Sequence, residues 1–234
     1  MPNWVFTSYE IEGPKEDMTK FLAGLGITPT DTDKVVKILE TYYPVPQKLM
    51  DRTAGFYSKE ALVDIQARSL KGEVSQEVVD QEAENLRLDD ECMEEFGYKN
   101  WYEWQYDKWG TKWGDCNTEV DQCTERDGKY VISGRFETAW GPALDGFRKV
   151  SSDFPTLRFQ FCYSEEADFF MGVEVLKNGE LIFEDVFSPQ DEFKVEAPDT
   201  GYDSPEWDEW SAKYDEFRHS LLSKIEAEAE KVGR

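Results

Sequence analysis

The sequence predicts an α+β fold, and three observations lead to this prediction. Five of the eight tryptophans lie in residues 100–142, and because large aromatic side chains bury about 150–250 Å² each, a domain core is expected there. Segments of alternating hydrophobicity, typical of strands, are interspersed with segments of 3-4 apolar spacing, typical of helices. Residues 204–232 carry the longest helical pattern. The chain is long enough for one large domain, or for one domain with an appendage.

The N-terminal segment predicts a strand followed by a helix. Residues 4–12 alternate between apolar and polar side chains and stop at Gly13-Pro14. Proline suits the first turn of a helix, so the strand is expected to lead directly into one. Residues 15–25 place Met18 and Phe21 at helical spacing. The sequence therefore predicts one β-α unit here.

Residues 28–96 predict an acidic helical insertion after this first helix. Helices are expected over 32–43, 59–70 and 75–96. From Glu73 to Glu95 the sequence has ten carboxylates and one basic residue, Arg87. A segment with this charge pattern is expected to be solvated over much of its surface.

Residues 97–187 complete the predicted sheet. Two strands are expected to meet at Asp127-Gly128 and two more at Asn178-Gly179, because these dipeptides favour tight hairpin turns. A helix between the two pairs is expected to end at Pro155. The expected segments are strands 116–127 and 129–138, helix 142–154, and strands 157–163, 169–176 and 180–187. This order predicts a ferredoxin-like β-α-β-β-α-β core over residues 1–27 and 97–187, with an added β-hairpin.

Residues 188–234 predict an acidic linker and a long C-terminal helix. Ser204-Pro205-Glu206 supplies an N-cap, a first-turn proline and an early acid. A seam at 3-4 spacing then runs along the helix through Trp207, Trp210, Tyr214, Phe217, Leu221, Ile225 and Glu228. Because an apolar seam must be covered, we expect it to pack on the chain's own sheet. A seam shared with a second copy or with a partner is the alternative.

Several short motifs in a fixed order carry a resemblance to a known family. They are Met1–Val5, Trp101–Trp104, Trp109–Trp113, Phe136–Pro142 and Phe154–Phe159. With these motifs the chain resembles the YubB-type (Api-like) proteins, which are encoded on bacterial plasmids and phages. The resemblance covers the N-terminal strand and roughly residues 97–176. It implies a ferredoxin-like domain and an origin in a mobile element, but no mechanism, because the family has no established catalytic residues to carry over.

The formal net charge of −24 at pH 7 is the strongest compositional signal. A surface this negative repels nucleic acid and anionic membranes, and it attracts basic partners over a range set by the Debye length. Direct binding to nucleic acid or to a membrane is therefore not expected. The start of the chain lacks the pattern of a secretory signal, and no apolar run approaches a membrane span. We expect a cytoplasmic protein in a bacterial host.

The sequence offers no pattern for an enzyme, a metal site or a cofactor site. His219 is the only histidine, and the four cysteines form no CxxC pair. No GxGxxG, P-loop or GxSxG motif is present. We therefore expect no catalytic residues, no metal and no cofactor.

The remaining chemical signal is the density of carboxylates. Carboxylates held on rigid elements can replace duplex phosphates, which are spaced at one charge per about 1.7 Å of axis. The alternative is an acidic surface that maintains solubility and has no binding role. Because the resemblance implies a mobile element, we expect a DNA-mimicking inhibitor of a basic, nucleic-acid-binding host defence protein, such as a CRISPR effector, a nuclease or a restriction system. The other functional class is an oligomerising structural or regulatory protein, a homodimer through the C-terminal seam.

Two acidic sets are expected to form the partner-binding surface. The set in the insertion is Glu73, Glu77, Asp80, Glu82, Glu84, Asp89, Asp90, Glu91, Glu94 and Glu95. The set near the last helix is Asp191, Glu192, Asp199, Asp203, Glu206, Asp208 and Glu209. Charge-assisted contacts from these side chains to Arg and Lys of the partner would weaken with salt.

Overall fold

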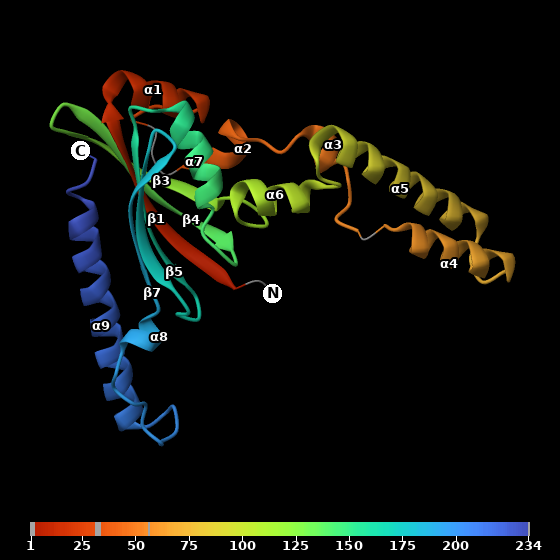
Figure 1. The fold of residues 1–234 in the computed structure, drawn as a ribbon. Coiled ribbons are helices and arrows are strands. Elements are labelled where there is room, and N and C mark those ends of the chain that lie inside the picture. The colour runs from red at the N-terminus through yellow and green to blue at the C-terminus, as the bar shows by residue number, and fades with distance from the viewer. Residues whose placement is uncertain (1–2, 31–33, 56, 234) are drawn as a thin grey trace. The chain divides into compact units, whose positions relative to one another are not determined.

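The computed structural model describes residues 3–30, 34–55 and 57–233 of the chain. It divides into two compact units (Figure 1), the sheet unit of residues 1–43 and 110–234 and the helical unit of residues 44–109. The predicted α+β class with an antiparallel sheet is confirmed. Met1 and Pro2 of the opening motif, and Thr32 at the start of a predicted helix, lie outside the described residues.

The described part of the sheet unit contains one seven-stranded sheet in the order β2-β3-β4-β1-β5-β6-β7, with antiparallel neighbours throughout. Its strands are β1 Trp4–Pro14, β2 Lys34–Val36, β3 Cys116–Arg126, β4 Lys129–Ala139, β5 Arg158–Glu165, β6 Met171–Lys177 and β7 Glu180–Phe187. Its helices are α1 Lys15–Gly24, α2 Ile38–Tyr42, α7 Leu144–Asp153, α8 Pro189–Glu192 and α9 Pro205–Ala229. The helices α1 and α7 lie on one face of the sheet and α9 on the other (Figure 1).

Aromatic side chains fill the space between the sheet and α7. Phe147 of α7 packs on Phe136 of β4 and Phe161 of β5, with ring centroids 5.2 and 4.7 Å apart. All three are almost completely buried. Because successive strand residues point to opposite faces, Tyr9 and Phe161 face α7, whereas their neighbours Ser8 and Cys162 face the α9 side.

The helix α9 packs on the opposite face through the C-terminal half of its seam. Ile225 and Ala229 form a buried cluster with Val173 and Val175 of β6, and Leu221 packs against it. The N-terminal half of the seam surrounds Phe193 of the linker instead, whose ring centroid lies 5.2 Å from those of both Tyr214 and Phe217. The seam is thus covered from within the chain by two different surfaces, and only one of them is the sheet. Glu228 of the predicted seam is exposed.

The helix predicted over residues 32–43 is wrong for residues 34–36. Residues 34–36 form the edge strand β2, which pairs with residues 118–120 of β3. The buried Asp115 carboxylate accepts hydrogen bonds from the amides of Ile38 and Leu39 at 2.7 and 3.0 Å. These bonds fix the start of α2 after the strand, because the first amides of a helix have no partner within it. Residues 34–43 therefore belong to the sheet unit, whereas the sequence placed them in the insertion over 28–96.

The helical unit contains a short helix, a hairpin of two longer helices and a short aromatic helix. Its helices are α3 Gln47–Met50, α4 Lys59–Leu70, α5 Gln76–Phe96 and α6 Trp101–Trp109. Asn100 begins α6, since its side-chain oxygen accepts from the amides of Tyr102 and Glu103 at 3.0 and 3.1 Å. Trp104 and Trp109 meet edge to face with their ring centroids 5.6 Å apart.

The tryptophan-rich segment does not build one core, contrary to the expectation from its composition. Trp104 and Trp109 are buried and belong to the helical unit. Trp113 and Trp140 belong to the sheet unit and are 37% and 43% exposed. The chain passes from one unit to the other at Gly110, which has a positive φ of 77°. The core of the sheet unit is formed largely by phenylalanine and aliphatic residues.

Candidate functional site

Five carboxylates of the predicted binding set share one face of α5. Glu77, Asp80, Glu84, Glu91 and Glu95 follow one another at intervals of three, four, seven and four residues. Such intervals return to the same side of an α-helix with 3.6 residues per turn. Four of them are exposed and Glu91 is half-buried. We name this set the α5 acidic face.

Cations of the same unit partly neutralise the α5 acidic face. Arg87 lies between Glu84, 2.7 Å away, and Glu91, with which it forms a short ion pair. The Arg87 hydrogen bond holds the pKa of Glu84 below its usual range. Lys48 pairs with Glu95 at 2.7 Å. Exposed pairs of this kind are weak, so a strongly basic partner could compete for these carboxylates.

Asp89 is not available to a partner, so its assignment to the binding surface is wrong. Its side chain is completely buried and accepts from Arg52 at 3.1 and 2.8 Å. Asp89 lies three residues before Cys92, which is also fully buried, and this spacing places both on the inner side of α5. A buried charge requires a partner, and Arg52 supplies it.

The rest of the insertion set is dispersed around α5. Glu73 lies in the turn before the helix, 3.5 Å from Arg68 of α4. Asp90 and Glu94 are exposed and Glu82 is half-buried. Within the described residues, no ion pair involves these last three carboxylates.

The second predicted set lies on the sheet unit, apart in the chain from the α5 acidic face. All seven carboxylates, in α8, in the linker and in the first turns of α9, are exposed. Glu206 and Asp208 also have a structural role, because acids at a helix N-terminus interact favourably with the macrodipole. Glu209 forms an ion pair with Lys213 at 2.6 Å, and the hydrogen bond from Lys213 lowers the pKa of the Glu209 carboxyl.

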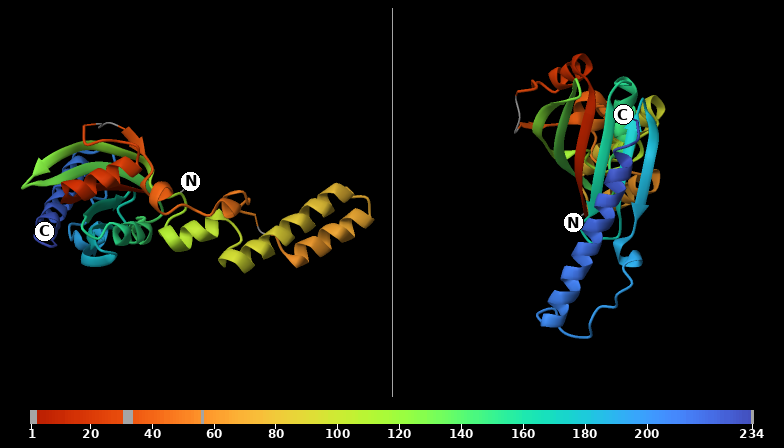
Figure 2. Two further views of the ribbon diagram at one scale, coloured as in Figure 1. Left: turned by 90° about the horizontal axis from the view of Figure 1, so that it is seen from above. Right: turned by 90° about the vertical axis from the view of Figure 1, so that its left-hand side faces the viewer.

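A groove on the α9 side of the sheet was not predicted. In the right-hand view of Figure 2, α9 lies over β6 and β7 and leaves β1 and β4 uncovered. A hollow of about 380 Å³ opens there, and Phe6, Ser8, Cys162 and Leu222 are among its lining residues. A second hollow of about 330 Å³ shares Ser8 and Cys162 with the first. The signal in the sequence was the run of small side chains at alternate strand positions, Ser8, Ser133, Cys162 and Ser164.

The reactive side chains lack the surroundings that activate a nucleophile or hold a metal. Burial raises the pKa of all four free cysteines, whereas a catalytic thiol needs a lowered pKa. His219 is exposed on α9, with its Nδ1 2.6 Å from the Asp215 carbonyl oxygen. Across the described ranges, no three His, Cys, Asp or Glu side chains converge on a position for a metal ion. None of the helices in the described part of the chain has the length and hydropathy that a membrane span needs.

A buried carboxyl on β6 makes stability depend on pH. Glu174 is 5% exposed and accepts a hydrogen bond from Tyr163 Oη at 2.7 Å. Burial raises the pKa of Glu174 above its ordinary value of 4.5. The folded state therefore holds this proton more tightly than the unfolded state does. Its contribution to stability is complete below pH 4.5 and is lost as the pH rises through the folded-state pKa.

We expect the variant Glu174→Gln to lose this part of the pH dependence, because glutamine keeps an acceptor for Tyr163 and does not titrate. Urea unfolding at about pH 5.5 and about pH 8 measures the effect as the change in unfolding free energy between the two conditions. The wild type should lose more stability toward high pH than Glu174→Gln does. Glu180→Gln, at an exposed position, is the matched control. Equal pH dependence in Glu174→Gln and the wild type would contradict the assignment.

Comparison with known proteins finds a family model to which part of the chain is similar. Residues 108–215, slightly less than half of the sequence, match the family model described as a ferredoxin-like domain in Api92-like protein. This match confirms the predicted ferredoxin-like domain and the resemblance to Api-like proteins for these residues. The crystal structure of a protein api92 from Yersinia pseudotuberculosis is similar, with a TM-score of 0.40 and 11% identity over 80% of this chain and 98% of that chain. None of the curated proteins matches.

Proposed function

We propose that the protein is a non-enzymatic binding protein that occupies the basic, nucleic-acid-binding surface of a host defence protein. The observation that carries the proposal is the α5 acidic face, five carboxylates on one side of a 21-residue helix. A plasmid or phage origin, which the resemblance implies, and a place in the bacterial cytoplasm belong to the same proposal. The partner would be a CRISPR effector, a nuclease or a restriction enzyme.

The negative charge of the α5 acidic face, and its position on one rigid helix, support this function. The spacing of its carboxylates supports it less. From Glu77 to Glu95 the α5 acidic face extends about 27 Å, at 1.5 Å per residue. Five carboxylates over this length are several-fold sparser than the phosphates of a duplex, which follow one another at about 1.7 Å. The net charge of −24 adds long-range attraction to a basic groove. The face would therefore compete with DNA for a cationic surface without copying the phosphates one by one.

A competition experiment tests the proposal. A fluorescein-labelled DNA duplex bound to a purified host nuclease or CRISPR effector is titrated with the protein, and the anisotropy reports displacement. We expect displacement at low salt that weakens steeply as salt is added, because the contacts are electrostatic. The triple variant Glu77→Gln, Asp80→Asn, Glu84→Gln should displace the duplex at least about tenfold less well, which corresponds to about 1.4 kcal/mol.

The control changes the same number of charges elsewhere. Glu166→Gln, Glu180→Gln, Asp185→Asn removes three exposed carboxylates from the sheet unit and should displace the duplex as the wild type does. Salt-independent displacement would refute the proposal. Equal loss in both triple variants would show that net charge acts without a defined face.

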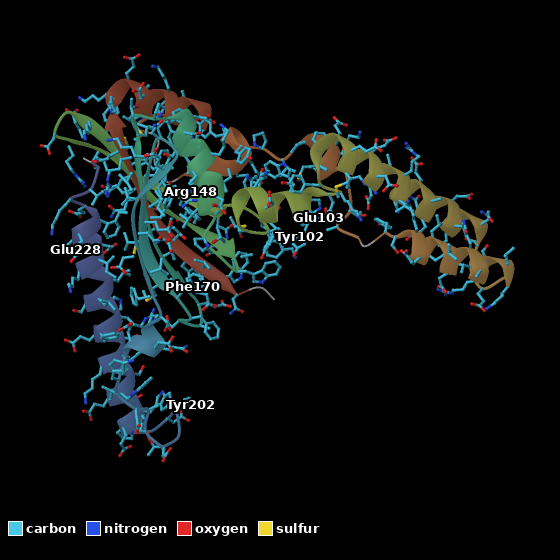
Figure 3. The ribbon with its side chains drawn as sticks, in the orientation of Figure 1. Tyr102, Glu103, Arg148, Phe170, Tyr202 and Glu228 are labelled. Atoms are coloured by element: carbon cyan, nitrogen blue, oxygen red, sulfur yellow. The ribbon has the colours of Figure 1, made fainter. Side chains whose placement is uncertain are left out.

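A homodimer through the aromatic part of α9 is the second candidate. The observation in its favour is the partial exposure of this cluster: Tyr202, in contact with Trp207 at a ring distance of 4.6 Å, is 78% exposed, and Figure 3 shows it beside the N-terminal end of α9. Light scattering with sedimentation velocity on the full chain decides the question. A monomer at all concentrations would remove this candidate.

A further inference from the structure

The groove on the sheet unit has a floor of small side chains. On this face Ser8 of β1 lies between Arg135 of β4 and Cys162 of β5 in the strand register. Two residues earlier on β1, and on the same face, Phe6 lies between Glu137 of β4 and Ser164 of β5. Larger side chains at Ser8, Cys162 and Ser164 would fill the hollow, so it exists because these positions are small.

One end of the groove is apolar. Phe6 is 47% exposed, and Leu222 of α9 lines the same 380 Å³ hollow. An exposed phenylalanine beside a concave surface offers an apolar side chain a place to bury itself from water. The volume lies at the lower end of the range for ligand pockets, about 300–1,000 Å³.

The other end of the groove is acidic. The 330 Å³ hollow is lined by Asp121, Glu226 and Glu230, together with Glu10. Two cations pair with carboxylates of this region: Arg135 contacts Glu119 at 2.8 Å and Asp121 at 3.7 Å, and Arg126 contacts Glu10 at 3.2 Å. Negative charge therefore exceeds positive charge around the groove, which favours a cationic occupant over an anionic one.

We propose that this groove binds an extended basic segment of a partner protein in which apolar and cationic side chains alternate. One apolar side chain would lie on Phe6 and Leu222, and cations would pair with Glu226 and Glu230. The lining positions of β1 run from Phe6 to Glu10, about 13 Å at 3.3 Å per residue, a length that about five extended residues cover. The site lies on a different unit from the α5 acidic face and does not depend on competition with DNA.

A labelled peptide tests the groove directly. The probe is a fluorescein-labelled decapeptide that alternates Arg and Leu, titrated against the full chain and read by anisotropy. A decapeptide that alternates Arg and Ser has the same charge without apolar anchors, and we expect it to bind at least about tenfold more weakly. Ser8→Leu should weaken binding of the Arg-Leu peptide by at least about tenfold, because leucine fills the floor that both hollows share.

Matched variants separate the groove from general attraction by an acidic protein. Glu226→Gln, Glu230→Gln should weaken binding and reduce its salt dependence. Glu216→Gln, Glu228→Gln removes two exposed carboxylates of the same helix and should have no comparable effect. Figure 3 shows Glu228 on the side of α9 that faces away from the sheet. Ser220→Leu, at an exposed position of α9, controls for the added leucine.

The thiol of Cys162 gives a second, local readout. Burial raises its pKa most, and the neighbouring Glu226 carboxylate raises it further. Because the thiol is therefore alkylated slowly, the reaction is followed over time for each cysteine separately by mass spectrometry. The Arg-Leu peptide should slow alkylation of Cys162 and leave Cys123 unchanged. Equal binding by Ser8→Leu and the wild type, or equal loss in both pairs of Gln variants, would overturn the proposal. Equal protection of Cys162 by spermidine would also overturn the proposal, because it would assign the groove to small cations. A dimer that Ser8→Leu abolishes would overturn it too, because it would assign the groove to a second copy of the chain.

Discussion

The variant Gly134→Ala should lose about 3 kcal/mol of unfolding free energy or more, at the upper end of the range for overpacking. A Cβ at this position would lie 1.9 Å from the carbonyl oxygen of Glu119 and 2.6 Å from Tyr9 Oη. The first is a backbone atom of β3. It lies next to a register shift in the pairing of β3 with β4, which occurs between residues Val120 and Gln122 of β3. The second belongs to a side chain that is 3% exposed and that donates to the same carbonyl at 2.9 Å. The carbonyl oxygen cannot move without disturbing the β3-β4 pairing, and the Tyr9 hydroxyl cannot move without losing its hydrogen bond to that oxygen.

Urea unfolding followed by tryptophan fluorescence and far-UV circular dichroism measures this loss. Gly201→Ala is the matched control, because a Cβ there would have nothing within 4 Å. We expect the control to stay within about 0.5 kcal/mol of the wild type. A loss below about 1 kcal/mol in Gly134→Ala would show that the close approach of β3 to β4 is relieved in solution.

The variant Asp89→Leu should destabilise the helical unit by about 3–5 kcal/mol, because it leaves the buried Arg52 charge without its counterion. Arg52 is 8% exposed and Asp89 is fully buried. Arg52 also donates to the Asn85 carbonyl oxygen at 2.9 Å, and this single bond cannot compensate the guanidinium charge. Hydrogen exchange resolved for peptides of α4 and α5 reports the loss in this unit separately from the sheet unit.

A double mutant identifies the cause of the loss. Arg52→Met, Asp89→Leu removes both charges and should recover much of the stability, because an apolar pair of similar volume costs less than one isolated buried charge. Glu95→Gln breaks the exposed pair with Lys48 and should change the stability by no more than about 1 kcal/mol. A double mutant as unstable as the sum of its two single variants would attribute the loss to packing instead of charge.

Local signals allowed parts of the fold to be predicted from the sequence. The alternation of residues 4–12 matches β1, and Ser204 caps α9 by accepting a hydrogen bond from the Trp207 amide at 3.1 Å. The turn residues Asn178 and Gly179 adopt positive φ values of 53° and 76° between β6 and β7. In each case neighbours in the chain set the geometry, so the pattern is visible in one dimension.

The candidate sites depended on contacts that are distant in the sequence. The carboxylates of α5 were predicted as one group, yet Asp89 alone is buried, because Arg52 lies 37 residues away in the chain and beside it in space. The edge strand β2 exists because three residues pair with β3 and Asp115 caps the helix that follows. The groove arises where α9 leaves β1 uncovered, and the small strand residues that form its floor do not by themselves indicate where α9 lies.

The sequence by itself determined the α+β class, the helix and turn signals and the negative charge of this protein, since each follows from composition or from spacing along the chain. Only the tertiary structure decided which carboxylates face solvent, how the tryptophans are divided between two units, and that a hollow lies beside α9. The physical reason is that burial and charge pairing depend on which elements meet across the fold, and Asp89 and Glu77 are alike in sequence until Arg52 is placed beside one of them.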